Sequence, residues 1–431
     1  MNNRIVSVIR AQNLSLSSLK SSLFVREFLL FASSTILYQG SRFVVNLGAA
    51  RILGPTTFGL WNMLNLILAY SSVIHLGIIN GMNRDVPHFK GKGDLRKVRE
   101  IRQVTLGFMS LSTFVASIGI AVVALFIENL SLRASLQFTG LLLLCTQIYS
   151  YLQIYLKSDR RFNQMSYQQF AFAGILPMVA IPLVMMHKLP GFVLGQSVAT
   201  LTISLFIIKV IPFDFRPKLH VQETIRLIKV GFPIMAAGLL YGILTTADRW
   251  VIISFLGVEQ LGYYSLAIMV MGFLTLVPIV IAQQIYPRMA EAYGQASNYD
   301  ALKKWLVRQV IMGVGVTFPL IVGTYFIFPP GVQRFLPAYV PGIAAMKTIL
   351  IGPLFLPIAG GCGNFLNTVN KQVYNMAVQG FAILIDVALN ITFVKMGLGI
   401  NGVALGTALT YMSYSLILAL VTIRIIRSGP A

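Results

Sequence analysis

Stretches of about 20 apolar residues alternate with short polar segments along the whole chain. A helix of that length crosses the ~30 Å hydrocarbon core of a bilayer. The pattern predicts about twelve such helices, about six in each half. They lie near residues 28–50, 58–82, 103–127, 134–156, 165–187, 191–211, 230–254, 261–286, 306–328, 340–366, 373–394 and 402–423. We therefore expect an all-α integral membrane protein.

The same pattern occurs twice. The segment ILGPTTFGLWNM at 52–63 returns as FLGVEQLGYYSL at 255–266, a shift of 203 positions. A second match, shifted by 211, pairs Met165 with Met376, Gln168 with Gln379, Phe170-Ala171 with Phe381-Ala382, Gly191 with Gly402, and Leu194-Gly195 with Leu405-Gly406. The halves are a duplicated unit, and we predict two tandem six-helix bundles, residues 1–215 and 216–431. Residues 1–26 are expected to form an interfacial helix leading into the first bundle.

The amino-acid composition also indicates a membrane protein. Of 431 residues, 56% are apolar and 11% are charged, whereas charged residues make up about a quarter of a soluble domain. Cys145 and Cys362 both fall in apolar stretches, which predicts neither a disulfide nor a metal site. No loop is long enough for an extramembrane catalytic domain, and no nucleotide-binding motif is present. Tandem bundles are typical of transporters rather than enzymes, so we expect no enzymatic activity and no cofactor.

The basic residues separate by side. Counted over alternate loops, 26 of the 34 lysines and arginines fall on the side of the N-terminus, five fall on the other side, and three lie inside spans. By the positive-inside rule both termini are cytoplasmic. Orientation thus accounts for most of the net charge of +21, which in a soluble protein would suggest nucleic acid. The basic run at 90–102 includes two acids and no aromatic partners for bases, so we predict a cytoplasmic loop near anionic lipid and no nucleic-acid binding.

Charged residues inside spans are the main candidates for function, because an ionised side chain near the bilayer centre costs at least about 2.5 kcal/mol. Arg42 lies about nine residues, or roughly 14 Å, from the outer end of the first span. Gln39, Arg42 and Asn46 follow each other at spacings of three and four and share one helix face. These three residues are predicted to line a central cavity.

The second half carries a corresponding stripe. Tyr241, Thr245 and Asp248 share one face of the seventh span, with Arg249 beside them. Position 42 superposes on 245, so we expect the two stripes to meet at the cavity. A purely structural alternative is an Arg42–Asp248 or Arg249–Asp248 pair that only holds the halves together.

Asp386 lies about midway along the eleventh span, with Asn390 one turn further on. A carboxylate there could bind a coupling proton or sodium ion. A hydrogen-bonded carboxyl that packs helices together is the structural alternative, and the residues leave both open.

Three features of the sequence occur together in a known protein family. They are the duplicated LGxxxxG(L/Y)(W/Y) motif, the Asp248-Arg249 pair before its second copy, and the GxxLG in the sixth and twelfth spans. Over essentially its whole length the chain resembles the polysaccharide-transport branch of the multidrug/oligosaccharidyl-lipid/polysaccharide exporter superfamily, which includes the O-antigen (Wzx-type) flippases of lipopolysaccharide synthesis. The resemblance implies a V-shaped twelve-helix transporter around a central cavity, in a prokaryotic inner membrane, that works by alternating access.

Such a protein would move polyprenyl-diphosphate-linked oligosaccharide from the cytoplasmic to the outer leaflet, driven by an ion gradient. Arg42 and Arg249 would then attract the diphosphate or acidic sugars, and Asp248 and Asp386 would balance or couple that charge. Expected partners are the lipid-linked glycan, the bilayer, and a glycosyltransferase, polymerase or ligase of the same pathway.

Two other functions remain open. A cation-coupled multidrug exporter of the same superfamily would move amphipathic cations and would need a surplus of carboxylates in its cavity. A membrane glycan polymerase or acyltransferase would need a large outer loop or a cluster of His and carboxylate residues, and the only outer acids are Glu128 and Glu259.

Overall fold

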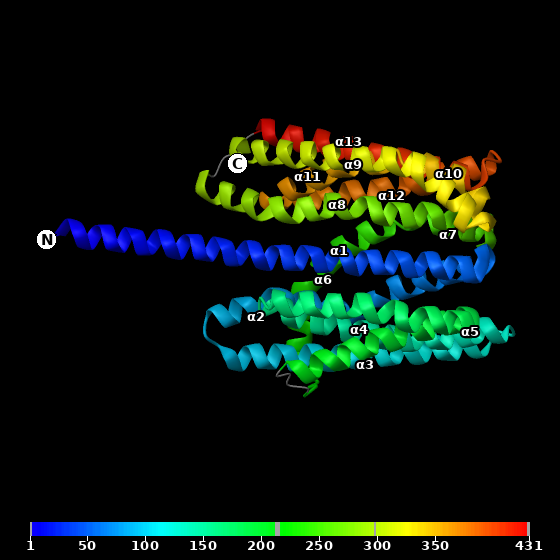
Figure 1. Cartoon of the computed structure of the whole chain (residues 1–431), viewed down its shortest axis with the longest axis horizontal. Helices are drawn as coiled ribbons and strands as arrows, with labels where there is room; N and C mark the ends of the chain where they lie inside the picture. Colours follow the sequence, from blue (N-terminus) through cyan, green and yellow to red (C-terminus); the bar gives the residue numbers. More distant parts are fainter. Residues whose placement is uncertain (1, 212–215, 297–298, 429–431) are drawn as a thin grey trace. The chain divides into compact units, whose positions relative to one another are not determined.

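The computed structural model describes residues 2–211, 216–296 and 299–428, with side chains from residue 30 onward except at 72, 277, 296 and 301. This part of the chain is almost wholly helical and contains no strand (Figure 1). The α-helices and the 3-10 helices (η) are α1 (Asn2–Ser71), η1 (Ser72–His75), α2 (Ile78–Gly91), α3 (Leu95–Leu125), α4 (Leu130–Ser158), α5 (Phe162–Val210), α6 (Val221–Leu244), α7 (Ala247–Phe255), α8 (Val258–Ala296), α9 (Tyr299–Phe335), η2 (Pro337–Gly342), α10 (Ile343–Ile349), η3 (Gly352–Leu354), α11 (Leu356–Thr368), α12 (Gln372–Lys395) and α13 (Gly399–Ser428).

Within the described ranges, nine helical stretches are long and apolar enough to cross a membrane. Two of them, Leu30–His75 with 46 residues and Phe162–Val210 with 49, are long enough for two spans each. The backbone leaves the helical conformation at Gly54 (φ 75°) in the first and at Lys188 (φ 52°) in the second. The 29-residue α4 is also long enough to cross the bilayer. The predicted all-α multi-pass architecture with about twelve spans is confirmed. The expected interfacial face of residues 1–26 lies outside the described side chains.

By packing, the chain divides into two compact units. Unit 1 contains Met1–Gly48 and Ser71–Pro233, and unit 2 contains Ala49–Tyr70 and Ile234–Ala431. This division differs from the predicted boundary at residue 215 in two segments. Residues 49–70 pack with the second half, and residues 216–233 pack with the first. The boundary of the duplication itself stays a prediction.

Glycines explain why residues 216–233 belong to unit 1. A Cβ added to Gly231 would lie 1.9 Å from the carbonyl oxygen of Gly77, and one added to Gly107 would lie 2.3 Å from that of Lys218. The amide of Lys218 also donates to the carbonyl of Gln103 over 3.0 Å. Only glycine permits such approaches of one backbone to another. The segment between the halves is thereby held on α2 and α3.

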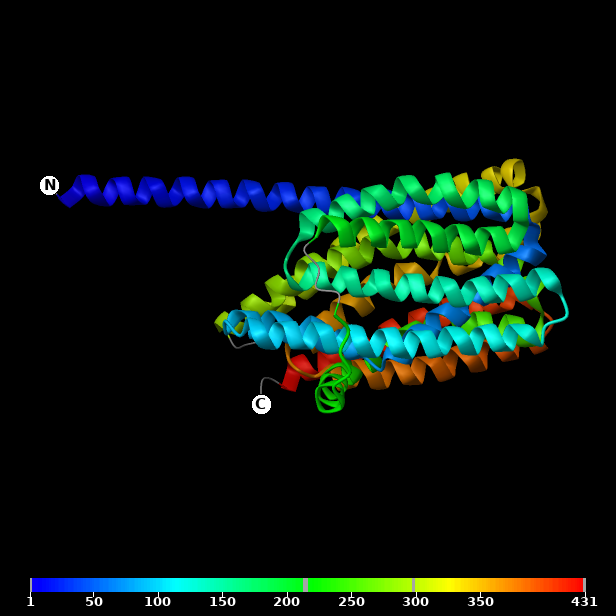
Figure 2. The same ribbon diagram turned by 90° about the horizontal axis from the view of Figure 1, so that it is seen from below.

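Ion pairs complete this packing at the ends of the unit 1 helices. Arg226 of α6 donates to Asp85 of α2 over 2.6 Å and to Glu223 over 2.7 Å, and Lys97 of α3 donates to Glu223 over 2.9 Å. Figure 2 shows α3 and α4 side by side and joined by a short turn. At the other end of α4, Asp159 accepts from Arg102 over 2.7 Å and from Lys90 over 3.0 Å. The basic loops therefore have structural partners within their own unit.

The duplicated motif accounts for residues 49–70 in unit 2, because its two copies pack on each other. A Cβ on Gly59 would lie 2.1 Å from the carbonyl oxygen of Val258, and one on Gly262 would lie 1.9 Å from that of Pro55. These contacts are related by the shift of 203 positions. The first glycine of each copy, Gly54 or Gly257, adopts a positive φ of 75° or 89°. The glycines of the motif therefore allow its two copies to pack closely against each other.

In unit 2, α8, α9, α11, α12 and α13 form a bundle of neighbouring helices (Figure 1). Two apolar clusters fill it, one around Leu302, Phe365 and Leu418, the other around Leu261, Ala345 and Val403. The tenth predicted span is not one straight helix, since η2, α10, η3 and α11 replace it. This broken region lines the polar cavity described below.

Candidate functional site

Two carboxylates lie in the interior of unit 2. Asp248, in the first turn of α7, is 5% exposed. Its Oδ2 accepts from the hydroxyl of Tyr264 on α8 over 2.8 Å, and its Oδ1 accepts from the backbone amide of Arg249 over 2.8 Å. Tyr264 is fully buried. The carboxylate is therefore held by two donors away from bulk water.

Asp386, on α12, has no exposed surface. Its Oδ2 accepts from the side-chain amide of Asn390 over 3.0 Å, while its Oδ1 has no hydrogen-bond partner among the described residues. Because α7 packs on α12, the two carboxyl groups are close enough to interact electrostatically. We call Asp248, Tyr264, Asp386 and Asn390 the carboxylate centre.

The close packing of α13 on α12 positions this centre. A Cβ added to Gly406 of α13 would lie 2.2 Å from Oδ1 of Asn390. Thr407, on the same helix, accepts from Asn390 over 3.5 Å. Buried polar groups are normally fully hydrogen-bonded. The unpartnered oxygen of Asp386 is therefore a free acceptor that a proton or a small cation could satisfy.

The other predicted residues of the second half, Tyr241, Thr245 and Arg249, do not hydrogen-bond to either carboxylate through their side chains. Tyr241 is 37% exposed. Thr245 donates to the backbone carbonyls of Tyr241 and Gly242, so its hydroxyl is occupied. Arg249 is half-buried and its Nε has no hydrogen-bond partner. Within the described residues its side chain makes no ion pair with Asp248, because that carboxylate accepts from Tyr264 and from the backbone instead.

The predicted residues of the first half lie on α1 in unit 1. Arg42 is exposed, with its guanidinium carbon 5.7 Å from the centre of the Tyr38 ring. Among the described residues of unit 1 no acidic side chain pairs with it. Asn46 donates to the backbone carbonyl of Arg42 over 2.8 Å, and Gln39 is half-buried. The predicted meeting of this stripe with the Asp248 stripe joins two different units and stays a prediction.

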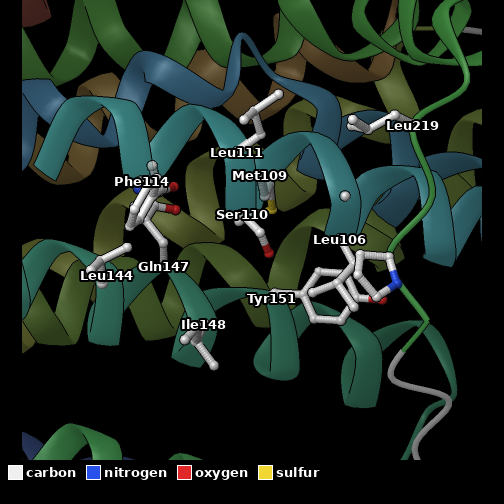
Figure 3. A pocket seen from close by; sticks show the side chains of 13 residues that line it. Leu106, Met109, Ser110, Leu111, Phe114, Leu144, Gln147, Ile148, Tyr151 and Leu219 are labelled. Atoms are coloured by element: carbon white, nitrogen blue, oxygen red, sulfur yellow. The ribbon is translucent and has the colours of Figure 1, made fainter. Parts of the chain in front are cut away.

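Each unit also contains one notable cavity. In unit 1 an apolar crevice of about 510 Å³ lies between α3, α4 and the segment around Leu219. Figure 3 shows Leu106, Phe114 and Ile148 on its walls, with Tyr151 at one end. This lining suits hydrocarbon. In unit 2 a cavity of about 220 Å³ is lined by amide and hydroxyl side chains, including Gln379 and Tyr414.

Sequence reasoning identified Asp248 and Asp386 but not Tyr264, the buried donor to Asp248. The signal was present, since Tyr264 belongs to the second copy of the duplicated motif. Gln379 was likewise visible only as a repeat match to Gln168. Neither position is charged, so neither stood out in an apolar helix. Among the described residues no group of three or more His, Cys, Asp or Glu gathers as a metal site would require.

A family model for polysaccharide biosynthesis proteins matches residues 49–338, which is more than half of the chain. This chain belongs to that family. No curated protein sequence matches it significantly.

Solved structures similar to the chain are transporters. The lipid II flippase MurJ in an inward closed conformation aligns with a TM-score of 0.73 and 15% identity, covering 92% of this chain and 88% of that one. An inward-facing multidrug resistance MATE family transporter of the MOP superfamily aligns with a TM-score of 0.71 and 15% identity, covering 90% and 95%. A MOP superfamily transporter from Pyrococcus furiosus, described as having reverse polarity of its binding pocket, aligns with a TM-score of 0.64 and 14% identity, covering 93% and 96%. At these identities the likeness establishes the fold, that of MOP superfamily transporters.

Proposed function

We propose that this protein is a flippase that moves polyprenyl-diphosphate-linked oligosaccharide from the cytoplasmic to the outer leaflet of the inner membrane, for assembly of a surface polysaccharide such as O-antigen. Both termini would be cytoplasmic. Family membership restricts the pathway to polysaccharide biosynthesis. The duplicated multi-pass fold favours transport over synthesis, because membrane bundles of this plan enclose substrate sites rather than catalytic domains.

The observation that carries the proposal is the carboxylate centre. Burying Asp248 and Asp386 in a membrane bundle is costly, and such residues usually mark a functional site. The free acceptor on Asp386 suits a coupling ion, H⁺ or Na⁺. Binding and release of that ion would change the charge balance between α7, α12 and α13, and so favour one packing of these helices over another.

Arg42 would serve the substrate. A diphosphate cannot enter ~30 Å of hydrocarbon unaided, whereas its polyprenyl tail can remain in lipid. An exposed arginine deep in the first span can pair with two phosphate oxygens at once. Arg249, whose Nε is unpartnered, would provide a second cation, with Gln39, Asn46, Tyr241 and Thr245 as polar contacts along the path.

The test begins with deletion of the gene in its native host. We expect a polyprenyl-diphosphate oligosaccharide to accumulate in the membrane lipids, detected by mass spectrometry, together with loss of surface glycan. The wild-type gene should restore export. The Arg42→Ala variant should not, because the diphosphate loses its main counter-charge, although its membrane level should be normal.

Arg51→Ala is the matched control, since Arg51 is also an exposed arginine of α1 but lies at the end of the span. It should restore export like the wild type. Export by the Arg42→Ala variant would overturn the role given to Arg42. An unchanged lipid profile after deletion, together with increased resistance to cationic dyes on overexpression, would favour the multidrug exporter instead.

A further inference from the structure

The polar cavity of unit 2 is formed by five helices. Residues of α6, α8, α11, α12 and α13 line its volume of about 220 Å³. Its polar lining consists of neutral amides and hydroxyls, chiefly Asn364, Asn367, Asn375, Gln379, Tyr241 and Tyr414, and no charged side chain among the described residues contributes to it. A cavity inside a membrane bundle that gathers so many neutral hydrogen-bonding groups requires a ligand or water to satisfy them.

Several of these groups have unused hydrogen-bonding capacity. Gln379 is 5% exposed, and its Oε1 has no partner among the described residues. Its amide donates only a long bond, 3.5 Å, to the hydroxyl of Tyr414, which in turn donates to Asn375 over 3.0 Å. Asn364 uses its amide nitrogen for Ala282 and Gln309, both over 3.0 Å. Its side-chain carbonyl oxygen accepts no hydrogen bond from the described residues, and Asn364 lines the cavity.

The backbone around the cavity keeps this space open. Pro357 lies in the first turn of α11, and Pro278 of α8 also lines the cavity. Gly360 and Gly363 line the wall without side chains. A Cβ added to Gly363 would come 3.5 Å from the amide nitrogen of Asn375 and would reduce the space in front of it.

We propose that this cavity binds an uncharged sugar unit of the lipid-linked glycan, an inference that rests on the proposed function. Sugar hydroxyls both donate and accept, as Asn and Gln side chains do. The rings of Tyr241 and Tyr414 offer apolar faces for the C–H surface of a sugar. A diphosphate or a uronic acid would find no counter-charge here. The glycan and its diphosphate would thus be recognised in separate places.

The test measures binding by the purified full-length protein in lipid nanodiscs. The probes are methyl α-glucoside, methyl N-acetyl-α-glucosaminide and methyl α-glucuronide, followed by saturation-transfer NMR with empty nanodiscs as background. We expect binding of at least one neutral glycoside, and at least about tenfold weaker binding of the charged glucuronide.

Gln379→Leu keeps the size of the side chain and removes its hydrogen bonds. We expect it to weaken neutral-sugar binding about tenfold or more, because a sugar hydroxyl then loses its hydrogen-bond partner. Gln168→Leu is the matched control, since Gln168 is the repeat counterpart of Gln379, is equally buried and lies outside the cavity. It should leave binding unchanged. Should Gln379→Leu not fold, the exposed Asn367→Ala provides the test, with a several-fold loss expected.

Three results would overturn the proposal. They are equal binding of neutral and charged glycosides, absence of any neutral-sugar binding, and equal effects of Gln379→Leu and Gln168→Leu.

Failure of the proposed flippase function would give a different set of results. If the wild type binds a neutral sugar but deletion of the gene leaves lipid-linked glycans unchanged, the sugar site stands and the transported substrate is another glycoside. If the glycan accumulates but no sugar binds, the flippase stands and the cavity proposal fails.

Discussion

The same pair of packed helices occurs once in each unit, and only the copy in unit 2 carries a buried carboxylate. In unit 1 the two halves of α5 meet where Gly195 faces Ala180, since a Cβ on Gly195 would lie 2.7 Å from the Cα of Ala180. In unit 2, α12 and α13 meet where Gly406 faces Asn390. A shift of 211 places Asp386 on Ile175 and Asn390 on Val179. Duplication thus produced two equivalent scaffolds, and the buried carboxylate is specific to the second.

The turn that precedes each pair shows the opposite distribution. In both units the chain leaves one helix through the same hydrogen bond, from Arg161 to the carbonyl of Leu156 and from Lys371 to that of Leu366. The unit 1 turn contains Asp159 and its basic partners, whereas Val369 holds the C-cap position in unit 2. Turns with the same backbone hydrogen bond therefore carry an ionic contact in unit 1 and an apolar side chain in unit 2.

The largest effect is expected from Asp386→Asn, which removes the carboxylate that unit 1 lacks at the corresponding Ile175. Translocation of the lipid-linked oligosaccharide in proteoliposomes should lose its dependence on an imposed proton or sodium gradient, because the free acceptor is replaced by a neutral amide. Glu259→Gln, at an exposed acid of the same unit, should leave that dependence intact. Gradient-dependent transport by Asp386→Asn at the wild-type rate would refute the coupling role.

The next effect concerns the other carboxylate of the centre. Tyr264→Phe removes the hydroxyl that donates to Asp248 and leaves a buried acceptor without its partner, which typically costs about 1–3 kcal/mol of folding free energy. We expect a lower melting temperature of the detergent-purified protein. Tyr263→Phe provides the comparison, since its hydroxyl donates to the exposed Glu259. It should melt close to the wild type, and equal shifts for both variants would contradict the importance of burial.

A smaller effect tests the ionic turn of unit 1. Burial raises the pKa of Asp159, but hydrogen bonds from Lys90 and Arg102 and their charges outweigh it, so the pKa lies below its usual value of 3.8. A carboxyl with a lowered folded-state pKa adds stability above its unfolded pKa and loses it as the pH falls through the folded value. Asp159→Asn should therefore reduce stability at pH 7 and flatten the decline below about pH 4. Melting curves between pH 3 and 7 would check this, and a slope equal to that of the wild type would exclude it.

The smallest effect concerns the backbone of the two turns. Arg160 and Asn370 both adopt a left-handed conformation, with φ of 56° and 58°. Glycine at such a position relieves steric strain at some entropic cost, for a net gain of up to about 1 kcal/mol. Arg160→Gly should raise the melting temperature more than Asn370→Gly, because asparagine tolerates this conformation better than arginine. A larger rise in melting temperature for Asn370→Gly would show that side-chain contacts, rather than backbone strain, determine the stability of the turns.

Local pattern was enough to predict the helices and the duplication. A run of apolar residues long enough to span the bilayer forms a helix whatever its neighbours, because no other segment conformation satisfies its backbone in lipid. The breaks were less predictable. The tenth span, with Pro353 and Pro357, is broken into short elements, whereas Pro177, Pro182, Pro278 and Pro319 lie inside longer helices.

The helical membrane character, the duplication and the rare charges at Arg42, Asp248 and Asp386 can all be read from residues close together in the chain. What those charges contact depends on the folded structure. The donor to Asp248 is Tyr264, the partner of Asp386 is Asn390, and the polar cavity draws on five helices. Such contacts join residues on different helices, and helix crossings are set by where glycines let two backbones approach, which a linear pattern does not specify.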